Sequence, residues 1–570
     1  MISKQARKIF FRNIPIVVLL SVFSVALIAL TAKTFIDNLP YLDNFDLLSR
    51  VWVFFKTQGF SEYVFIFFLI VSYEYFGVTE KASIKEALSA TPTGVNRIKR
   101  KQFLVMASIS GAFFVVFVIC NVIAAGLFGC LTAKFLIHII ISTFLNFFLI
   151  GILAVLAGAY IASLRKKVTQ YIALLAIVFL TSPIFTDMFP TALIMTEVAD
   201  IFPVTNLFDI FPPNLKSTFI FPFGTSVLPY RFEIILFWCL LTVLLMSLSE
   251  HKSIKNKRNI ALLVATCLCF TSYCIPESTV KRNTDPTGAE YHDYNYYVMR
   301  SFAGENLYDM ECNSFDEEST EPFSVKSYKL DFFVANYLYG KAEIEIDDTK
   351  LLSSYIFTLY HGYKVTRIED ESGNKVTFNR RGDFIQILDI FGKTHYTVYY
   401  HGSCPKFYSN FQGMALPGDL AYYPVAGLQR QYDKGNQNML AVHPETVDFE
   451  VKVHGYAQRV FCNLPETGRN SFKGTSNGVT LLSGFYEEYK VDNCSFVCSY
   501  LDGEAKEENF RRILSDFETS GQLQKIDGKK IMVMPSLNQG SYGTSLDDHI
   551  VSHGSLSNFI RSVKGADKNA

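Results

Sequence analysis

Residues 73–101 read YEYFGVTEKASIKEALSATPTGVNRIKRK, a charged stretch that lies between two long apolar runs. It is too polar for the interior of a lipid bilayer, so we expect a cationic loop between two membrane spans. Within it, Ile84 and Leu88 fall near one face of a short helix that Pro92 would end. Such a helix, held between two spans, would allow a soluble partner to push on the membrane domain. An ordinary positively charged cytoplasmic loop explains the same residues.

The composition indicates a membrane protein that carries a soluble domain. The chain has 570 residues, and its 53 Lys and Arg balance its 53 Asp and Glu. Its mean hydropathy is positive, and the apolar residues are concentrated in the first half. The cations of that half gather in short loops, while the second half has the charge pattern of an ordinary soluble surface. Nothing in this distribution indicates a nucleic-acid partner.

Seven apolar runs predict a membrane α-helical bundle of about seven spans. The first run is long enough to cross a hydrocarbon core of about 30 Å and too long for a cleaved signal peptide. The last run is the weakest, because Thr271 and Ser272 interrupt it. The expected spans are residues 14–36, 63–78, 103–128, 135–164, 171–189, 232–248 and 260–275.

The distribution of cations predicts the orientation of this bundle. If the N-terminus is cytoplasmic, the inside segments hold 17 Lys and Arg, whereas the outside loops and span edges hold about six, Arg231 among them. The positive-inside rule then predicts a multi-pass plasma-membrane protein whose N-terminus is cytoplasmic and whose chain after Pro276 lies outside. Six spans would instead leave the second half in the cytoplasm.

The outside loop 191–230 is rich in Phe and Pro, as in DIFPVTNLFDIFPPNLKSTFIFPFG. It is too apolar for a free loop and too interrupted by proline for a spanning helix, so we expect it in the outer interface or in the mouth of the bundle. Phe211, Phe219 and Phe221 are candidates for a substrate gate, although ordinary interfacial packing explains them as well. Ionisable groups are nearly absent deep within the spans, which disfavours an ion-coupled carrier.

The first half resembles the permease subunits of type-2 ABC exporters in its basic start SKQARKIFFRN, its stretch TEKASIKEALSATPTG and the IKRKQF that begins the third span. In that family the loop between the second and third spans carries a coupling helix that docks on a separate ATPase, and two permease halves surround one pathway. The resemblance covers roughly residues 1–250. It implies ATPase-coupling roles for Glu74, Ile84, Leu88 and Pro92. The family has six spans, so the seventh expected here would carry the chain outward.

From Ser324 onward the hydrophobicity alternates with period two, in KAEIEID, GDFIQILDI, THYTVYYHG and TVDFEVKVHG. This predicts an extracytoplasmic all-β sandwich or saddle domain at 324–502, after a transmembrane domain at 1–276 and a linker at 277–323. Gly392-Lys393-Thr394 looks like the end of a phosphate loop, but Ile387 stands where that loop needs glycine. We therefore expect no nucleotide and no other cofactor on this chain.

The β half resembles the N-terminal β-domain of the aminopeptidase N family of zinc peptidases. The matching stretches are YKVTRIEDESGNKVTF, GDFIQI, HYTVYYHG, LAYYPVAG and VDFEVKVHGYAQRVFCNLPETG. That family's chemistry needs an HExxH zinc motif and a GxMEN strand, and neither occurs in the sequence. His549 and His553 are four residues apart, but Ile550 stands where the catalytic Glu would be. The two could still bind a metal with Asp547 or Asp548, and surface residues near the C-terminus explain them better. Residues 503–570 are then a remnant or a small cap, and we expect no metal and no enzyme.

Ser476 lies in Gly474-Thr-Ser-Asn-Gly478, which matches the G-x-S-x-G elbow of hydrolases by letter only. It stands in a period-two region without a following helix, so a hairpin turn explains it better than a nucleophile does. These observations predict a permease subunit of an ATP-driven ABC exporter whose outside domain handles a peptide-like substrate. The partners would be an ATPase, a second permease half (the same or a different chain) and membrane lipid. The alternative is a membrane-anchored binding or sensing protein without transport.

Overall fold

The computed structural model divides into two compact units, which we call the helical unit and the β unit. The helical unit comprises residues 1–43, 50–215 and 225–281, and the β unit comprises 44–49, 216–224 and 282–570. The structure describes residues 10–38, 57–81, 94–195, 202–212, 222–251, 256–274, 301–302, 305–315, 322–335, 337–347, 352–388, 390, 392–402, 404, 408–433, 437–438, 441–456, 458–501, 505–534 and 542–554.

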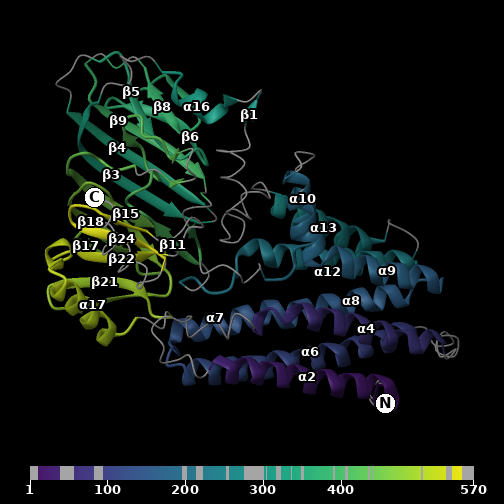
Figure 1. Cartoon of the computed structure of the whole chain (residues 1–570). Coiled ribbons are helices and arrows are strands. Elements are labelled where there is room, and N and C mark those ends of the chain that lie inside the picture. The colour runs from purple at the N-terminus through teal and green to yellow at the C-terminus, as the bar shows by residue number, and fades with distance from the viewer. Residues whose placement is uncertain are drawn as a thin grey trace. The chain divides into compact units, whose positions relative to one another are not determined.

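The apolar runs of the first half form helices at the expected places (Figure 1). Thr132 begins one of them as an N-cap, because its Oγ1 accepts a hydrogen bond from the backbone N–H of Phe135 at 3.1 Å. The elements are α2 (Ile14–Asn38), α4 (Ser61–Lys81), α6 (Gly94–Leu127), α7 (Ala133–Thr143), the π-helix η2 (Phe144–Leu149), α8 (Ile150–Ala162), α9 (Lys167–Leu180), the π-helix η3 (Ile184–Met188), α10 (Phe189–Met195), α11 (Phe202–Thr205), α12 (Pro229–His251) and α13 (Lys257–Cys274).

Within the described residues, five helical segments are long and apolar enough to cross a membrane. They are Ile14–Thr34, Ser61–Val78, Arg97–Leu127, Ala133–Ala162 and Pro229–Ser249. The fifth predicted span corresponds to α9, which is apolar but has only 14 residues before the chain turns into η3. The seventh corresponds to α13, which is not among the five. Several candidate spans are therefore present, and the number seven stays a prediction.

Close packing of α4 against α8 forms the centre of the helical unit. Gly158 permits it, because a Cβ at this position would lie 2.6 Å from the carbonyl oxygen of Leu69 and 2.9 Å from the backbone nitrogen of Tyr73. Aromatic rings fill much of the remaining core, as where Phe117 of α6 stacks on Phe147 of η2 with centroids 4.0 Å apart. Buried apolar area of this kind holds the helices together within the unit.

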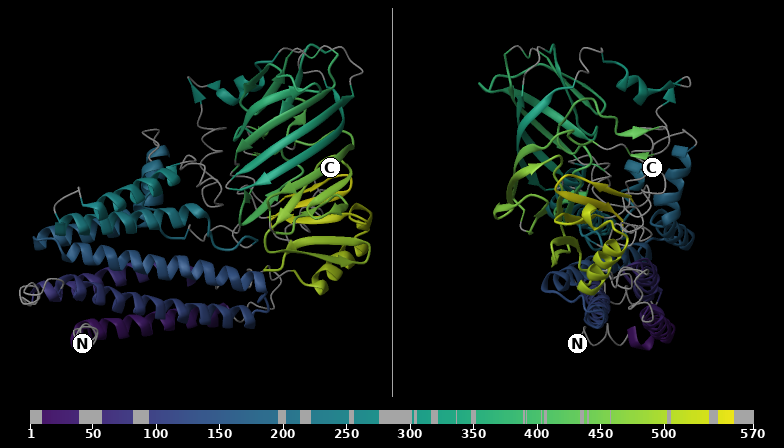
Figure 2. Two further views of the ribbon diagram at one scale, coloured as in Figure 1. Left: turned by 180° about the vertical axis from the view of Figure 1, so that it is seen from behind. Right: turned by 60° about the vertical axis from the view of Figure 1, so that its left-hand side comes forward.

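The β unit is built on an open seven-stranded sheet in the order β17-β18-β15-β3-β4-β9-β6. Figure 2 shows its long teal and green strands lying side by side. Neighbours are antiparallel except β15 and β3, which are parallel. The predicted alternation is present, since every second residue of β4 is buried. The strands are β3 (Ser324–Val334), β4 (Leu338–Asp347), β6 (Tyr363–Asp370), β9 (His395–Gly402), β15 (Val447–His454), β17 (Glu466–Gly468) and β18 (Ser471–Ser476).

Two four-stranded sheets, in the orders β10-β11-β19-β16 and β12-β5-β8-β7, share one hydrophobic core with the large sheet. None of these sheets closes into a barrel within the described strands. The strands are β5 (Tyr355–Thr358), β7 (Phe378–Arg381), β8 (Phe384–Ile387), β10 (Tyr408–Asn410), β11 (Gly413–Leu416), β12 (Val425–Ala426), β16 (Phe461–Cys462) and β19 (Leu481–Ser483). Short pairs form at β1 (Ser301–Phe302) with β2 (Glu305–Asn306), before α16 (Leu307–Cys312), and at β13 (Tyr432–Asp433) with β14 (Gln437–Asn438).

The C-terminal part of the β unit is a five-stranded mixed sheet that crosses the boundary expected at 502/503. Its order is β20-β21-β22-β24-β23, and β22 is parallel to both β21 and β24. The crossover from β21 to β22 contains α17, whose Phe510 stacks on Phe496 at 4.5 Å, so this part is not all-β. The elements are β20 (Tyr486–Val491), β21 (Cys494–Ser499), α17 (Glu507–Thr519), the short 3₁₀-helix η8 (Leu523–Lys525), β22 (Lys530–Met534), β23 (Tyr542–Ser545) and β24 (His549–His553).

The described end of the Phe-rich loop before α12 belongs to the β unit rather than to the mouth of the bundle. Phe223 is buried there and stacks on Tyr408 with centroids 3.9 Å apart. The backbone N–H of Phe485 donates to the carbonyl of Pro222 at 2.7 Å. Gly413 makes room for the ring, since a Cβ at this position would overlap Phe223. The expectation that the loop lies in the outer interface or the mouth of the bundle is therefore corrected for Phe223, because apolar side chains of the β unit bury this residue.

Candidate functional site

A buried polar cluster lies where α12 begins in the helical unit. We call Arg231, Asn146 and Gln58 the Arg231 cluster. The Arg231 side chain is 2% exposed, and its Nη2 donates to Asn146 Oδ1 at 2.9 Å. The Nδ2 of Asn146 donates in turn to Gln58 Oε1 at 2.8 Å. The π-helix η2 carries Asn146, and π-helical turns inside α-helices occur frequently at functional sites.

Backbone carbonyls complete the environment of the guanidinium. Arg231 Nη1 donates to the carbonyl of Ser226 at 2.6 Å, and Nη2 donates to the carbonyl of Ile210 at 3.2 Å. These bonds attach both ends of the loop before α12 to η2. An ionisable group buried in a bundle that spans a membrane is a functional-site hypothesis in its own right. The sequence predicted Arg231 at an outer span edge. Its position directly before an apolar run was the only sequence feature that could have indicated its burial.

Of the three candidate gate residues, Phe211 is placed next to this cluster. Its ring meets the ring of Phe65 on α4 edge to face, with centroids 5.6 Å apart, and it follows Ile210 directly in the chain. Phe211 is partly buried against the helical core, and its role as a gate stays a prediction. Phe219 and Phe221 lie outside the described residues, so their role as a gate stays a prediction.

Of the four predicted coupling residues, only Glu74 lies within the described residues. It is on α4, about two turns before the helix ends, and it is half-buried. Its neighbour Tyr73 donates from its hydroxyl to Gln170 Oε1 on α9 at 2.9 Å. Ile84, Leu88 and Pro92 lie outside the described residues, and the proposed docking of an ATPase on them rests on the sequence.

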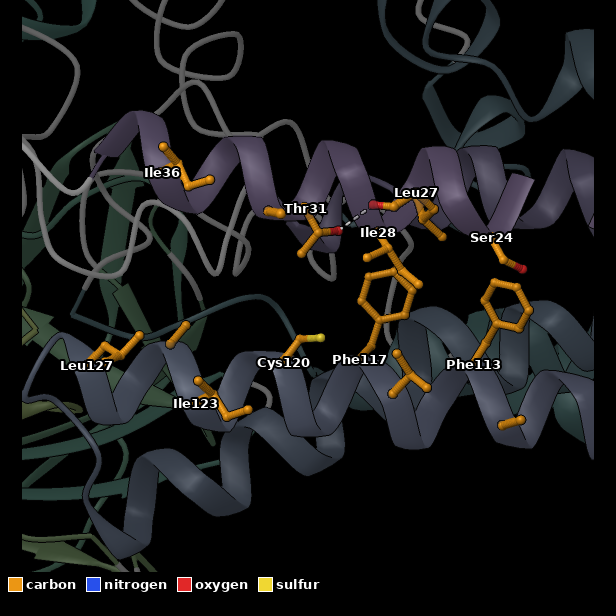
Figure 3. Close-up of a pocket in the computed structure, with 14 residues that line it drawn as sticks. Ser24, Leu27, Ile28, Thr31, Ile36, Phe113, Phe117, Cys120, Ile123 and Leu127 are labelled. Carbon is orange, nitrogen blue, oxygen red and sulfur yellow. Dashed lines mark hydrogen bonds between the residues drawn. The ribbon is translucent and has the colours of Figure 1, made fainter. Parts of the chain in front are cut away.

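An apolar groove of about 480 Å³ runs between α2 and α6 (Figure 3). Figure 3 shows Ile28 of α2 facing Phe117 of α6 and, farther along, Thr31 facing Cys120. The few polar groups in it are satisfied locally, as where Thr31 Oγ1 donates to the carbonyl of Leu27 at 2.8 Å. The residues that line it carry no charge. A surface of this composition suits the acyl chains of membrane lipid.

In the β unit, His549 and His553 are buried on the strand β24, which corrects the expectation of surface residues. His549 Nδ1 lies 2.8 Å from Asp548 Oδ1, and its Nε2 lies 2.8 Å from Thr480 Oγ1. A hydroxyl, an imidazole and a carboxylate in this order can relay a proton. Thr480 and His549 are both fully buried, whereas the side chain of Asp548 is 29% exposed, and the network joins the start of β24 to the residue before β19.

Ser476 belongs to the same network, because its Oγ donates to Asp548 Oδ1 at 2.6 Å. Burial acts to raise the pKa of Asp548, but hydrogen bonds from His549, Ser476 and Asn463 outweigh it, and the pKa lies below its usual value. Ser476 ends β18 and is buried, so the structure uses this hydroxyl to hold a carboxylate.

A second carboxylate–histidine pair, buried at both residues, joins Asp419 to His553. The Nε2 of His553 lies 3.1 Å from Asp419 Oδ2, to which Thr544 Oγ1 also donates at 2.8 Å. Burial again acts to raise the pKa of this carboxyl, but the charge and hydrogen bond of His553, together with the hydrogen bond of Thr544 and one from the backbone, outweigh it, and the pKa lies below its usual value. Within the part of the chain that the structure describes, no three His, Cys, Asp or Glu side chains are placed to hold a metal ion.

Comparisons with known proteins give structural neighbours only, since no family model and no curated protein matches the sequence. A mutant M1 zinc metallopeptidase from Deinococcus radiodurans is 12% identical with a TM-score of 0.28, over 41% of this chain and 61% of that one. Native yeast LTA4 hydrolase is 10% identical with a TM-score of 0.28, over 42% of each chain. Aminopeptidase A of Legionella pneumophila is 8% identical with a TM-score of 0.29, over 43% of this chain and 31% of that one.

These neighbours are M1 zinc metallopeptidases, an LTA4 hydrolase and an aminopeptidase by their descriptions. They contradict the expectation that the chain is not an enzyme, because the matched proteins are peptidases and a hydrolase. We withdraw that expectation. This chain spans less than two thirds of the length of each of these three neighbours, and likenesses of this size assign no activity, substrate or metal to it. None of them tests the resemblance of the first half to ABC permeases.

Proposed function

We propose that this chain is the permease subunit of an ATP-driven ABC exporter. A separate ATPase would bind residues 79–101 on the cytoplasmic side. The β unit would lie outside and handle a peptide-like substrate, and a second permease half and membrane lipid would complete the assembly. The observation that carries the proposal is how α4 and α6, the helices that flank residues 82–93, pack with each other and with the N-terminal stretch.

Three segments meet at that anchor. Phe10, from the basic N-terminal stretch, is fully buried and packs edge to face on Tyr75 of α4 with centroids 5.2 Å apart. Gln102 of α6 donates from Nε2 to the carbonyl of Tyr75 at 3.2 Å, and it is buried too. A force applied between α4 and α6 would therefore reach the N-terminal stretch and both helices together. This arrangement fits the resemblance to type-2 permeases, in which the same loop receives the ATPase.

The charges support the assignment of this end to the cytoplasm. α4 and α12 end here, and α6 and α13 begin here with the cations Lys99, Arg100 and Arg258. By the positive-inside rule, an end with this many Lys and Arg faces the cytoplasm, where the ATP is.

The test is copurification of a nucleotide-hydrolysing subunit with the tagged full chain from its native membranes. We expect a partner that carries a phosphate-loop sequence and gives the complex ATPase activity. The double variant Ile84→Asp with Leu88→Asp should lose it, because two carboxylates replace the apolar face of the predicted coupling helix. The control variant Ser83→Asp with Ser89→Asp adds the same charge to the same loop and should keep it.

Retention of the ATPase by the Ile84 and Leu88 variant would contradict the coupling role. Purification of an intact chain without any ATPase would favour the membrane-anchored binding or sensing protein.

A further inference from the structure

A second pocket, of about 510 Å³, lies at the end of the helical unit where α6 and α13 begin. We call it the basic pocket. Three cations line it, Lys99 and Arg100 from α6 and Arg258 from α13. Its walls are apolar side chains of five helices, among them Phe103, Leu156 and Leu262. The α2–α6 groove has similar walls and no charge, so the two pockets differ in their charge and not in their apolar character.

The guanidinium of Arg258 is held by a neutral partner. Its Nη2 and Nε donate to Ser247 Oγ at 2.6 and 3.2 Å, and the Ser247 hydroxyl donates to Asn259 in turn. A guanidinium carries five N–H donors, so two bonds to one hydroxyl orient Arg258 while leaving donors for an anion. Arg100 is exposed on the same pocket, and it adds a second planar donor group.

We propose that the basic pocket binds one anionic phospholipid of the inner leaflet. The phosphate would bind to Lys99, Arg100 and Arg258, and the first part of an acyl chain would lie on the apolar wall. Charge complementarity favours this occupant, since basic pockets between helices on the cytoplasmic side bind anionic headgroups. A free phosphate would use the cations but would leave the apolar wall unoccupied. The inference rests on the membrane orientation of the proposed function and is independent of transport.

The first test removes the charges. The full chain is exchanged into vesicles of equal parts phosphatidylglycerol and phosphatidylcholine, extracted again in mild detergent, and examined by native mass spectrometry for retained lipid. We expect the wild type to retain phosphatidylglycerol over phosphatidylcholine. The variant K99Q/R100Q/R258Q should retain it about fivefold less for each cation removed.

The control is R97Q/K101Q/K257Q, which removes three cations from the same two helices at positions outside the pocket lining. It should retain phosphatidylglycerol like the wild type. An equal loss in both triple variants would overturn the proposal, because it would indicate general attraction to the bilayer surface. A wild type that retains no preference for phosphatidylglycerol would overturn it as well.

The second test keeps every charge and fills the pocket. Leu262→Trp places an indole in the apolar wall and should reduce retention, whereas Leu263→Trp, at an exposed neighbour outside the lining, should not. Inorganic phosphate added to the wild type should not displace the lipid, and displacement would contradict a lipid occupant. The ATPase is assayed in the same preparations, so loss of lipid with the ATPase retained, or the reverse, separates failure of this inference from failure of the proposed function.

Discussion

The helical unit and the β unit bury their charged groups in different ways. In the helical unit, the named hydrogen bonds of Arg231 go to an amide oxygen and to backbone carbonyls. In the β unit, Asp419 and Asp548 are each paired with a buried histidine. An arginine that is hydrogen-bonded to carbonyl oxygens keeps its charge across the accessible pH range. A carboxylate paired with histidine can gain a proton in acid, so its contribution to stability depends on pH. The difference predicts which substitutions harm which unit, and under what conditions.

The loop before α12 gives the largest expected effect, because Phe211 belongs to the helical unit whereas Phe223 belongs to the β unit. Phe223→Ala should lower the stability of the β unit by about 3–5 kcal/mol, since it empties a fully buried ring site. Phe211→Ala, earlier in the same loop, should instead lower the stability of the helical unit. Hydrogen exchange reports on the β unit. Fluorescence of Trp238 on α12 reports on the helical unit. If each variant destabilised both units equally, the assignment of Phe223 to the β unit and of Phe211 to the helical unit would be contradicted.

The next effect concerns the Arg231 cluster. Arg231→Met should destabilise the helical unit by about 1 kcal/mol for each of the three hydrogen bonds that it removes. Trp238, whose indole N–H donates to the carbonyl of Leu207 at 2.6 Å on the neighbouring segment, reports the loss by fluorescence during thermal unfolding. Arg97→Met, at an exposed arginine of α6, is the control and should change stability by less than about 0.5 kcal/mol. A tolerated Arg231→Met would show that the cluster is not needed for the fold.

The third effect is the pH dependence of the β unit. The folded pKa of Asp419 is lowered, so its pairing stabilises the fold above the unfolded pKa of about 3.9. That contribution is lost as the pH falls through the lower folded value. Asp419→Asn should cost about 1.5–3 kcal/mol at neutral pH and progressively less in acid. Urea unfolding of the β unit across pH measures this.

The exposed pair of Asp331 and His454, 3.3 Å apart, provides the control for this prediction. Asp331→Asn should change the stability of the β unit by less than about 1 kcal/mol at any pH, because solvent screens exposed pairs. A pH profile of Asp419→Asn parallel to that of the wild type would contradict the assignment of the acid-sensitive contribution to this carboxylate.

The sequence predicted elements that depend on local pattern. Apolar runs located the helices of the first half, and period-two alternation located β4, β8, β9 and β15. Both signals arise from residues within one element, so they need no knowledge of tertiary partners. The helix α17 and the parallel strands around β22 were not predicted. Neither a period-two pattern nor a family resemblance distinguished that part of the sequence from a small appended cap.

Burial of polar residues could not be predicted in the same way. The buried His553 has its hydrogen-bond partner Asp419 134 positions away in the sequence, and the buried His549 has its partner Thr480 69 positions away. The buried Arg231 donates hydrogen bonds to the carbonyl of Ile210, 21 positions earlier, and to the side-chain amide of Asn146, 85 positions earlier. Phe223 packs on Tyr408, far along the chain. Each of these residues looks exposed or interfacial in its own segment, and only the fold supplies its partners.

The side of the membrane on which the C-terminus lies is the most direct test of the account. A protease-sensitive tag fused after Ala570 is exposed to external protease in intact cells and in cells whose membrane has been opened. The account predicts cleavage in intact cells, because the β unit is proposed to lie outside, opposite the basic end that meets the ATPase. A tag that resists protease until the membrane is opened would place the β unit in the cytoplasm and contradict the proposed permease.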